Sequence, residues 1–208
     1  TSRLISRKSP AGWIQTSRGC PYGCVYCNKN IFGSNFRKMS AKRVVDEMEY
    51  TLSCGFREIH IADDCFTFDI ERAKNICREI LVRGLKFPWA TVAGIRADRV
   101  DYELLTLMKR AGCYRVYFGI ESGDGAILTL VRKGESLEQV EKAVRISKKI
   151  GLEVVGYFIL GLPGETAISM RKTIDFAKKL NLDMAKVTIA VPLPSTPFFE
   201  ELDRAGKI

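Results

Sequence analysis

The stretch RGCPYGCVYC, residues 18–27, places Cys20, Cys24 and Cys27 in a C-x3-C-x2-C pattern. Three thiols so close in the sequence indicate a metal or iron–sulfur ligand set. A structural zinc site takes four ligands, yet there is no second Cys-x2-Cys pair, and the one histidine, His60, lies in an apolar segment. The pattern therefore favours a [4Fe–4S] cluster, in which three protein thiolates would leave one iron open for a chelating ligand.

Outward from this loop, apolar segments alternate with amphipathic ones along the chain. We expect strands over 12–19, 57–64, 89–98, 114–123, 152–164 and 185–194. We expect helices between them, with Ser40 and Asp69 as N-caps, Gly84 as the end of the second helix, and Ser136 with Gln139 as a capping box. This alternation predicts an α/β fold with parallel strands and right-handed crossovers. Periodicity alone allows either an open doubly wound sheet or an incomplete barrel.

Unusual residues follow each expected strand. In both architectures the functional site lies at the carboxyl ends of the strands. After the cysteine loop, these residues are Asp63, Asp64, Arg96, Asp98, Glu121, Ser122, Gly123, Gly161, Pro163, Gly164, Glu165, Pro192 and Pro194. Turns need Gly, Pro and Asp for their own geometry, but the convergence of so many such residues on one rim predicts a site there.

The composition is that of a soluble globular domain. The chain has 208 residues, of which 46% are hydrophobic and 27% charged. No apolar run reaches the length of a membrane span, and residues 1–20 hold no signal-peptide core, so we expect a cytoplasmic protein without a membrane partner. The sequence lacks an initiator Met and stops one turn into an expected helix, so we expect a domain cut from a longer chain.

The net charge of +9 would suit a nucleic-acid partner. The Lys and Arg residues are spread along the chain and alternate with Glu, however, which favours a solvated surface instead. The cysteines outside the loop, Cys54, Cys65, Cys77 and Cys113, lie in apolar contexts, and we expect them to be buried, reduced thiols.

The cysteine pattern, with Tyr26 before the last cysteine, resembles the signature of the radical S-adenosylmethionine (SAM) superfamily. The resemblance spans nearly the whole chain and implies one radical SAM core domain over residues 1–208, folded as a partial (β/α)6 TIM-type barrel. It also implies that SAM chelates the open iron through its amino and carboxylate groups. An electron from the cluster then cleaves SAM to a 5′-deoxyadenosyl radical, which abstracts hydrogen from a substrate.

Further motifs resemble those that hold SAM in this family. IADDCF, residues 61–66, occupies the place of the Gly-Gly-Glu loop that receives the SAM ammonium, so Ala62, Asp63 and Asp64 match by position, although the glycines are absent. GIES, residues 119–122, resembles the ribose-contacting motif, with Glu121 and Ser122 as hydroxyl partners.

The resemblance also places a cation near the SAM carboxylate and apolar groups near its adenine. Lys133 lies where some relatives have a basic residue for the carboxylate, and Arg96 is a second candidate. YFILGLPGET, residues 157–166, resembles the G-x-I-x-G motif; Ile159 and Gly161 match, while Tyr157 replaces the first glycine. Tyr26 is expected to contact adenine. VPLPSTP, residues 191–197, resembles the P-x-P-G-T loop after strand six, which includes Pro192.

Taken together, the motifs most resemble the cobalamin-linked branch of Elp3-like radical SAM proteins. This implies a methyltransferase whose cobalamin would be held by a domain outside this chain, because His60 lacks the Asp-x-His-x-x-Gly context. A reductant such as flavodoxin or ferredoxin is the implied partner, and the substrate is not readable. Two alternatives stay open: a methylthiotransferase of tRNA, or a non-enzymatic module that binds a cluster or SAM.

Overall fold

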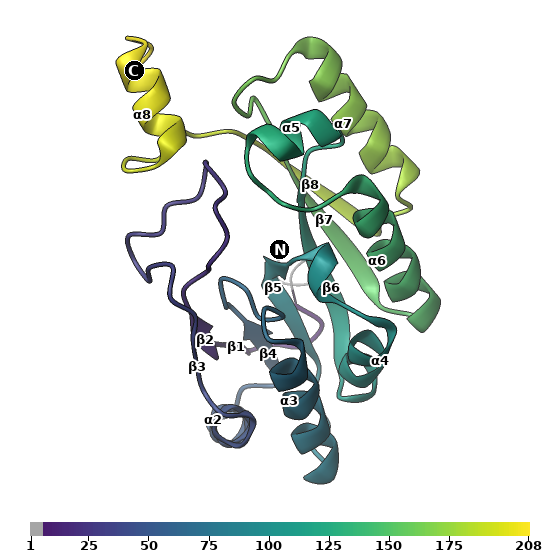
Figure 1. Ribbon diagram of the computed structural model, residues 1–208. Coiled ribbons are helices and arrows are strands. Elements are labelled where there is room, and N and C mark those ends of the chain that lie inside the picture. Colours follow the sequence, from purple (N-terminus) through teal and green to yellow (C-terminus); the bar gives the residue numbers. More distant parts are fainter. Residues whose placement is uncertain (1–5) are drawn as a thin grey trace.

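Six parallel strands form one curved sheet in the order β1-β4-β5-β6-β7-β8. The fold comes from a computed structural model that describes residues 6–208 (Figure 1). The strands are β1 (Ala11–Ile14), β4 (Glu58–Ile61), β5 (Trp89–Ile95), β6 (Cys113–Glu121), β7 (Glu153–Leu160) and β8 (Met184–Ile189). A doubly wound sheet would reverse its strand order at a switch point, but here spatial order follows chain order throughout. Within the described residues the two edge strands, β1 and β8, do not pair, so the expected partial (β/α)6 barrel is confirmed.

Helices follow the strands and lie side by side around the sheet (Figure 1). The main ones are α2 (Ala41–Ser53), α3 (Ile70–Val82), α4 (Tyr102–Arg110), α6 (Leu137–Ile150) and α7 (Ala167–Lys179). The expected N-caps are confirmed at Ser40, Asp69 and Ser136, whose side chains accept hydrogen bonds from backbone N–H groups of the first turn. Gln139 completes the capping box, and Gly84 follows α3 with a positive φ of 65°.

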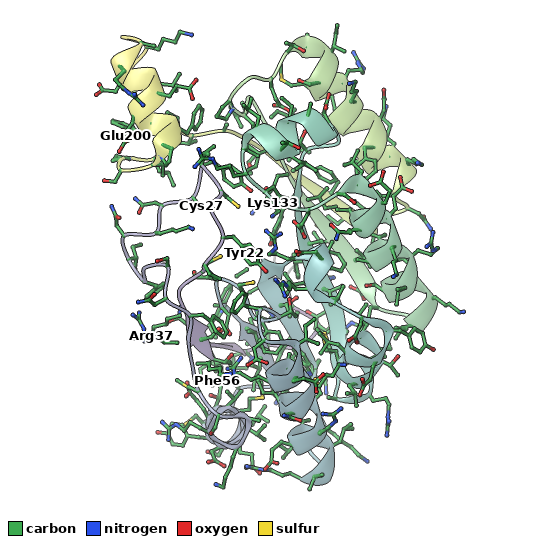
Figure 2. All side chains as sticks on the ribbon, in the orientation of Figure 1. Tyr22, Cys27, Arg37, Phe56, Lys133 and Glu200 are labelled. Atoms are coloured by element: carbon green, nitrogen blue, oxygen red, sulfur yellow. The ribbon has the colours of Figure 1, made fainter. Side chains whose placement is uncertain are left out.

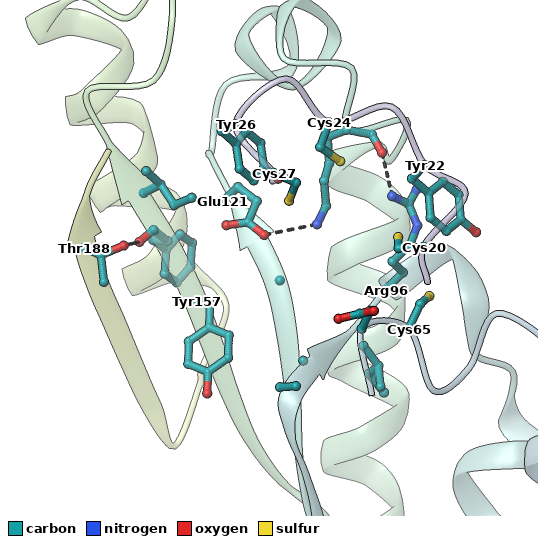
Figure 3. A pocket seen from close by; sticks show the side chains of 18 of the residues that line it. Cys20, Tyr22, Cys24, Tyr26, Cys27, Cys65, Arg96, Glu121, Tyr157 and Thr188 are labelled. Atoms are coloured by element: carbon teal, nitrogen blue, oxygen red, sulfur yellow. Dashed lines mark hydrogen bonds and ion pairs between the residues drawn. The ribbon is translucent and has the colours of Figure 1, made fainter. Parts of the chain in front are cut away.

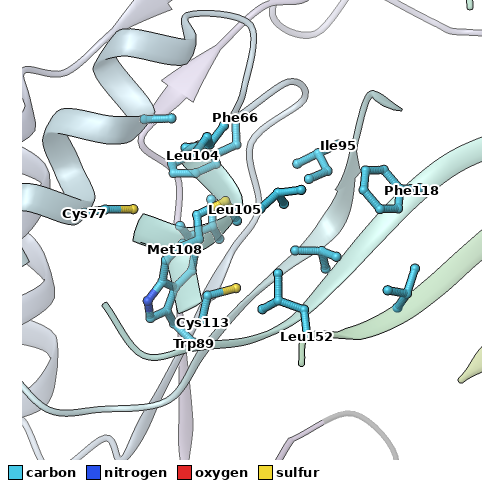
Figure 4. Packing of buried hydrophobic residues seen from close by; sticks show 14 of the residues in the cluster. Phe66, Cys77, Trp89, Ile95, Leu104, Leu105, Met108, Cys113, Phe118 and Leu152 are labelled. Atoms are coloured by element: carbon cyan, nitrogen blue, oxygen red, sulfur yellow. The ribbon is translucent and has the colours of Figure 1, made fainter. Parts of the chain in front are cut away.

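The core lies between the sheet and these helices (Figure 4). Trp89 is fully buried there, and its indole N–H donates to the carbonyl of Ala111 at 2.8 Å. Cys77 and Cys113 lie in this core, and burial raises the pKa of both thiols, to about 12 for Cys113. The expectation of a buried thiol is wrong for Cys54, which caps the exposed end of α2.

The first expected strand is shorter than predicted. Beyond β1 the chain forms β2 (Ser17–Arg18), which pairs antiparallel with β3 (Arg37–Lys38) and closes the base of the cysteine loop. Gly19 makes this closure possible: its φ is +86°, and a Cβ there would clash with the backbone carbonyl of Asn35. Strands of two residues are too short to show a period, so the sequence could not reveal this hairpin.

The last expected strand also ends early, at Ile189, ahead of Pro192 and Pro194, which have no N–H to pair. Short helical segments complete the fold: η1 (Ala97–Arg99), α5 (Gly125–Leu130) and α8 (Pro197–Arg204). Helix α8 begins against the cysteine loop, where the Phe198 N–H donates to the Val25 carbonyl at 3.2 Å. Within residues 6–208, none of the helices combines the length and the apolar content that a membrane crossing requires.

Candidate functional site

A cavity of about 360 Å³ opens at the carboxyl ends of the strands. Figure 2 shows Tyr22 and Cys27 of the cysteine loop near Lys133 at this end of the sheet. Of the residues expected from the sequence, the cavity wall contains Cys20, Cys24, Tyr26, Cys27, Asp64, Arg96, Glu121, Lys133 and Ile159. Ala62, Asp63, Ser122, Gly161 and Pro192 are not among the described residues that line it. A cavity therefore lies at the rim predicted from the strand ends, and nine residues of the expected set line it.

The cysteine loop is tied to the sheet from both sides. The Val25 N–H donates to the carbonyl of Val131 at 3.1 Å. The guanidinium carbon of Arg96 lies 3.6 Å from the centre of the Tyr22 ring, and the Tyr22 hydroxyl accepts a hydrogen bond from Arg99 at 2.6 Å. These contacts hold the loop over the strand ends with its thiols facing the cavity (Figure 3).

The loop thiols are electrostatically activated. A hydrogen bond from Cys27 lowers the pKa of Cys24 to about 6, with help from the positive charge of Lys133. A hydrogen bond from Cys65 likewise lowers the pKa of Cys20 to about 6. The pKa of Cys27 is raised, because it donates to Cys24. The thiolate is the form that binds metal. Within residues 6–208, no three His, Cys, Asp or Glu side chains are already arranged as a metal-ion site, so the three thiols provide the donor type but not a preformed ligand geometry.

Facing the thiols, Lys133 and Glu121 form an ion pair, with Nζ and Oε1 at 3.1 Å. Burial by itself lowers the pKa of Lys133, but the negative charges of Glu121 and Glu135 outweigh it and raise the pKa overall, so the ammonium stays charged. Glu121 has a positive φ of 67° at a bulge that ends β6. A left-handed backbone at a residue with a side chain is strained, and such strain is concentrated at functional sites.

Arg96 was expected as a second partner for the SAM carboxylate, but its side chain is engaged within the protein. It donates to both carboxylate oxygens of Asp98 and to the carbonyls of Lys133 and Gly134, at 2.7–3.2 Å. With its flat face against Tyr22, Arg96 links β5, the segment that carries Lys133, and the cysteine loop. Arg96 also lines the cavity, so its role as a second candidate for the SAM carboxylate stays a prediction.

The two acids after β4 have separate tasks. Asp63 is buried and accepts hydrogen bonds from the backbone and hydroxyl of Thr16 and from the hydroxyl of Ser17, so it fixes the chain after β1. Asp64 accepts from the Gly19 N–H at 3.0 Å and also lines the cavity. Both acids therefore position the entry to the cysteine loop, and Asp64 alone of the two reaches the cavity wall.

Three expected residues do not line the cavity and make contacts elsewhere near the strand ends. Ser122 is fully buried and shares a hydrogen bond with Thr173 at 3.1 Å, which joins the end of β6 to α7. Gly161 has a φ of +85°, and its N–H donates to Glu165 at 2.6 Å, which shapes the turn after β7. The Ala62 N–H donates to β1 at 2.9 Å.

The structure adds residues to the site that the motifs did not indicate. Cys65 and Tyr22 line the cavity, as do Tyr157, Lys186 and Thr188 further down the barrel interior. The ammonium of Lys186 lies 5.5 Å from the centre of the Tyr157 ring. Alternation along β7 and β8 could have found the last three, because side chains two apart on a strand share a face. Cys65 lies within the IADDCF stretch after the second strand, and this position is the signal that could have separated it from Cys54, Cys77 and Cys113.

A protein-family model described as the radical SAM superfamily matches residues 14–177. The chain belongs to the radical SAM superfamily. An uncharacterized methyltransferase of Pyrococcus horikoshii is 41% identical over 92% of this chain and 42% of its own length. The cytidylyl-2-hydroxyethylphosphonate methyltransferase of Streptomyces wedmorensis is 35% identical over 95% of this chain and 38% of its own length.

Among solved structures, the radical SAM methyltransferase TsrM from Kitasatospora setae, with cobalamin and a [4Fe–4S] cluster bound, superposes with a TM-score of 0.84. It is 26% identical and covers 94% of this chain and 37% of its own. This radical SAM chain therefore spans about two-fifths of the length of the proteins it resembles. Members of the superfamily use a [4Fe–4S] cluster with SAM and require a reductant.

The residues present fit these cofactors. The donor set is three thiols from one loop, and two of them have a lowered pKa. The positive charges of Lys133 and Arg96 act on Cys24 and would offset part of the negative charge that thiolate ligands bring to a cluster. Beside the thiols, the cavity adds a carboxylate, an ammonium and the side chains of Tyr26 and Ile159, which match the chemical groups of SAM.

Proposed function

We propose that this chain is the catalytic core of a radical SAM enzyme of the cobalamin-linked methyltransferase branch. One observation carries the proposal: three cysteine thiols of one loop face the Glu121–Lys133 ion pair across a single cavity at the strand ends. The likeness to two methyltransferases and to TsrM supports the branch. Residues 1–208 act here as one core unit, and flanking parts would complete the enzyme.

In this proposal Cys20, Cys24 and Cys27 hold the [4Fe–4S] cluster. When bound, the reduced cluster supplies one electron that cleaves the S–C5′ bond of SAM and yields a 5′-deoxyadenosyl radical. The task of the protein is orientation, because a correctly held reactant removes much of the entropic barrier. The hydrogen bond from the Val25 N–H to the Val131 carbonyl and the Arg96–Tyr22 contact hold the cysteine loop in the position that orients the cluster.

Other cavity residues bind SAM. Glu121 accepts hydrogen bonds from the ribose hydroxyls, and Lys133 forms a charge-assisted contact with the SAM carboxylate. Asp64 faces the SAM ammonium. Tyr26 and Ile159 pack against adenine, and both belong to one apolar cluster below the cysteine loop. Ala62, Ser122, Gly161 and Pro192 stay candidates for SAM contacts by motif position, although none of them is among the residues that line the cavity.

The partners follow from this chemistry. Cobalamin would be held by another part of the protein, and flavodoxin or ferredoxin would supply electrons to a cytoplasmic enzyme. The Lys and Arg residues form many ion pairs with surface carboxylates, which favours a solvated surface over a nucleic-acid partner. A tRNA methylthiotransferase stays the second candidate, because a putative methylthiotransferase of Methanocaldococcus jannaschii is 32% identical over 88% of this chain.

The test is anaerobic reconstitution of the protein with iron and sulfide, followed by SAM and a strong reductant. We expect about four irons per chain and slow release of 5′-deoxyadenosine without substrate. With the cobalamin-bearing part present, S-adenosylhomocysteine should appear as well, because a cobalamin methylase uses one SAM as methyl donor and another as radical source.

The matched variants are a triple Cys20, Cys24 and Cys27→Ala protein and Cys54→Ser, which removes an exposed thiol far from the cavity. The triple variant should lose the iron, and Cys54→Ser should keep it. Iron retained by the triple variant contradicts the ligand set. Full iron loading and tight SAM binding with no 5′-deoxyadenosine under any reductant would instead assign a non-enzymatic binding module.

A further inference from the structure

A fourth thiol faces the same cavity as the three of the cysteine loop. Cys65 follows β4, is 2% exposed, and lines the cavity together with Cys20, Cys24 and Cys27. Figure 3 shows the Cys65 and Cys20 side chains next to one another below the loop, and both line the cavity. Four cysteines, Cys20, Cys24, Cys27 and Cys65, therefore line one cavity.

The remaining cysteines are not placed in this way. Cys77 and Cys113 are in the apolar core behind the sheet, and Cys54 is at the exposed end of α2. None of these lines the cavity. The position of Cys65 is therefore a feature of the site, and the general tendency of free cysteine to be buried does not account for it.

Local contacts hold Cys65 opposite Cys20. The residue before each of them is joined to its counterpart, because the Asp64 carboxylate accepts from the Gly19 N–H at 3.0 Å. On the other side, Phe66 is buried against Trp89, with ring centres 6.0 Å apart. The Cys65 carbonyl also accepts from the Phe68 N–H at 3.1 Å. The thiol is thus presented by a fixed turn that is bonded to the cysteine loop.

We infer that Cys65 is a fourth protein ligand of the cluster in the absence of SAM, and that SAM displaces it. This inference rests on the proposed function of the same cavity. A fourth thiolate gives the full cysteine ligation typical of [4Fe–4S] clusters. On displacement, the Cys65 sulfur–iron bond breaks and bonds from the SAM amino nitrogen and carboxylate oxygen form. The ammonium of SAM loses a proton, the Cys65 thiolate takes up a proton, and no electron moves.

Such a ligand would protect the cluster. An iron without a protein ligand is open to solvent and is lost more easily on oxidation, and ligation by Cys65 closes that position until SAM arrives. Ligation by Cys65 would also weaken SAM binding. Only a fraction of the molecules would be competent to bind SAM, and the apparent dissociation constant is the intrinsic one divided by that fraction.

The experiment compares wild type, Cys65→Ala, Cys65→Ser and Cys54→Ser, all reconstituted anaerobically and freed of SAM. After mild oxidation with ferricyanide, we expect wild type and Cys54→Ser to keep about four irons. Cys65→Ala should lose one iron and show the EPR signal of a [3Fe–4S] cluster. Adding a small thiol, 2-mercaptoethanol, to Cys65→Ala before oxidation should prevent that loss. SAM should bind Cys65→Ala severalfold more tightly than wild type in a calorimetric titration.

If Cys65→Ala takes up little cluster on reconstitution, Cys65→Ser takes its place in the comparison, because serine keeps a polar side chain beside Cys20. Equal iron loss and equal SAM affinity in wild type and both Cys65 variants would overturn the inference and leave the proposed function intact. A Cys20–Cys65 disulfide in cluster-free protein, with cluster properties unchanged by the Cys65 variants, would assign the pair to thiol oxidation and also overturn it. If wild type binds no cluster, the proposed function itself fails.

Discussion

The ammonium of Lys133 lies 3.1 Å from the carboxylate of Glu121, although twelve residues and helix α5 separate them in the chain. Both residues line the cavity together with the three cysteines of the cysteine loop. Lys133 also lies 3.3 Å from the buried carboxylate of Glu135. One ammonium therefore joins the strained end of β6 to the segment that leads into α6.

Lys133→Ala should weaken SAM binding at least tenfold with the iron content unchanged, and Glu121→Ala should do likewise. Removing one charged contact to a buried ligand typically costs about 2–5 kcal/mol. Calorimetric titration of the cluster-loaded protein measures this. Lys172→Ala is the control, because it removes an ion pair with Asp124 outside the cavity. Unchanged affinity in both cavity variants would exclude the pair from SAM binding.

Gly19→Ala should reduce cluster loading strongly, because the added Cβ meets the Asn35 carbonyl and φ is +86°. A left-handed backbone at a residue with a side chain costs about 1–3 kcal/mol before any clash. Gly23→Ala, inside the same loop, meets no atom within 4 Å and should load normally. Iron analysis after reconstitution compares the two. Equal loading would show that the base of the loop tolerates a displaced backbone.

Arg96→Ala should lower the rate and extent of cluster loading, because it frees Tyr22 and the carbonyls of Lys133 and Gly134. Arg96→Lys should not restore loading, since an ammonium lacks the planar fork that makes these contacts together. Limited proteolysis of the cysteine loop provides a second measurement. Full rescue by Lys would mean that charge alone matters at this position.

Asp69→Ala should lower the free energy of unfolding by about 0.5–2 kcal/mol, the usual effect of losing an N-cap. The Asp69 side chain accepts from the Arg72 N–H and is paired with Lys38. Asp69→Asn keeps a capping oxygen without the charge, so its free energy of unfolding should fall less than that of Asp69→Ala. Urea unfolding of the three proteins at neutral pH measures the difference.

The stabilisation by Asp69 should also depend on pH. The hydrogen bond from Lys38 holds the pKa of Asp69 below its ordinary value. Because the folded pKa is the lower one, this stabilisation is complete above the ordinary pKa of about 4 and is lost as the pH falls through the folded value. The stability gap between wild type and Asp69→Asn should therefore narrow in acid. A gap that stays constant with pH would contradict the role of the Lys38 pair.

The sequence by itself determined the main helices, the six parallel strands and the edge of the sheet at which the candidate site lies, but not the β2–β3 hairpin. Periodicity and caps such as Ser136 with Gln139 depend on neighbours along the chain, so they could be read locally. The sequence also predicted correctly that the cysteine loop and the residues after each strand lie at the same edge of the sheet, because parallel strands bring their carboxyl ends to one rim.

Only the tertiary structure decided which residues on that rim share the cavity. Asp63 and Asp64 are adjacent in sequence, yet one is bonded to Thr16 behind the wall and the other lines the cavity. Cys65 and Cys77 both lie in apolar contexts, but only Cys65 faces Cys20. These differences depend on contacts between segments that are far apart in the chain, and on the curvature of a sheet whose strands follow one another in chain order. Local sequence patterns encode neither.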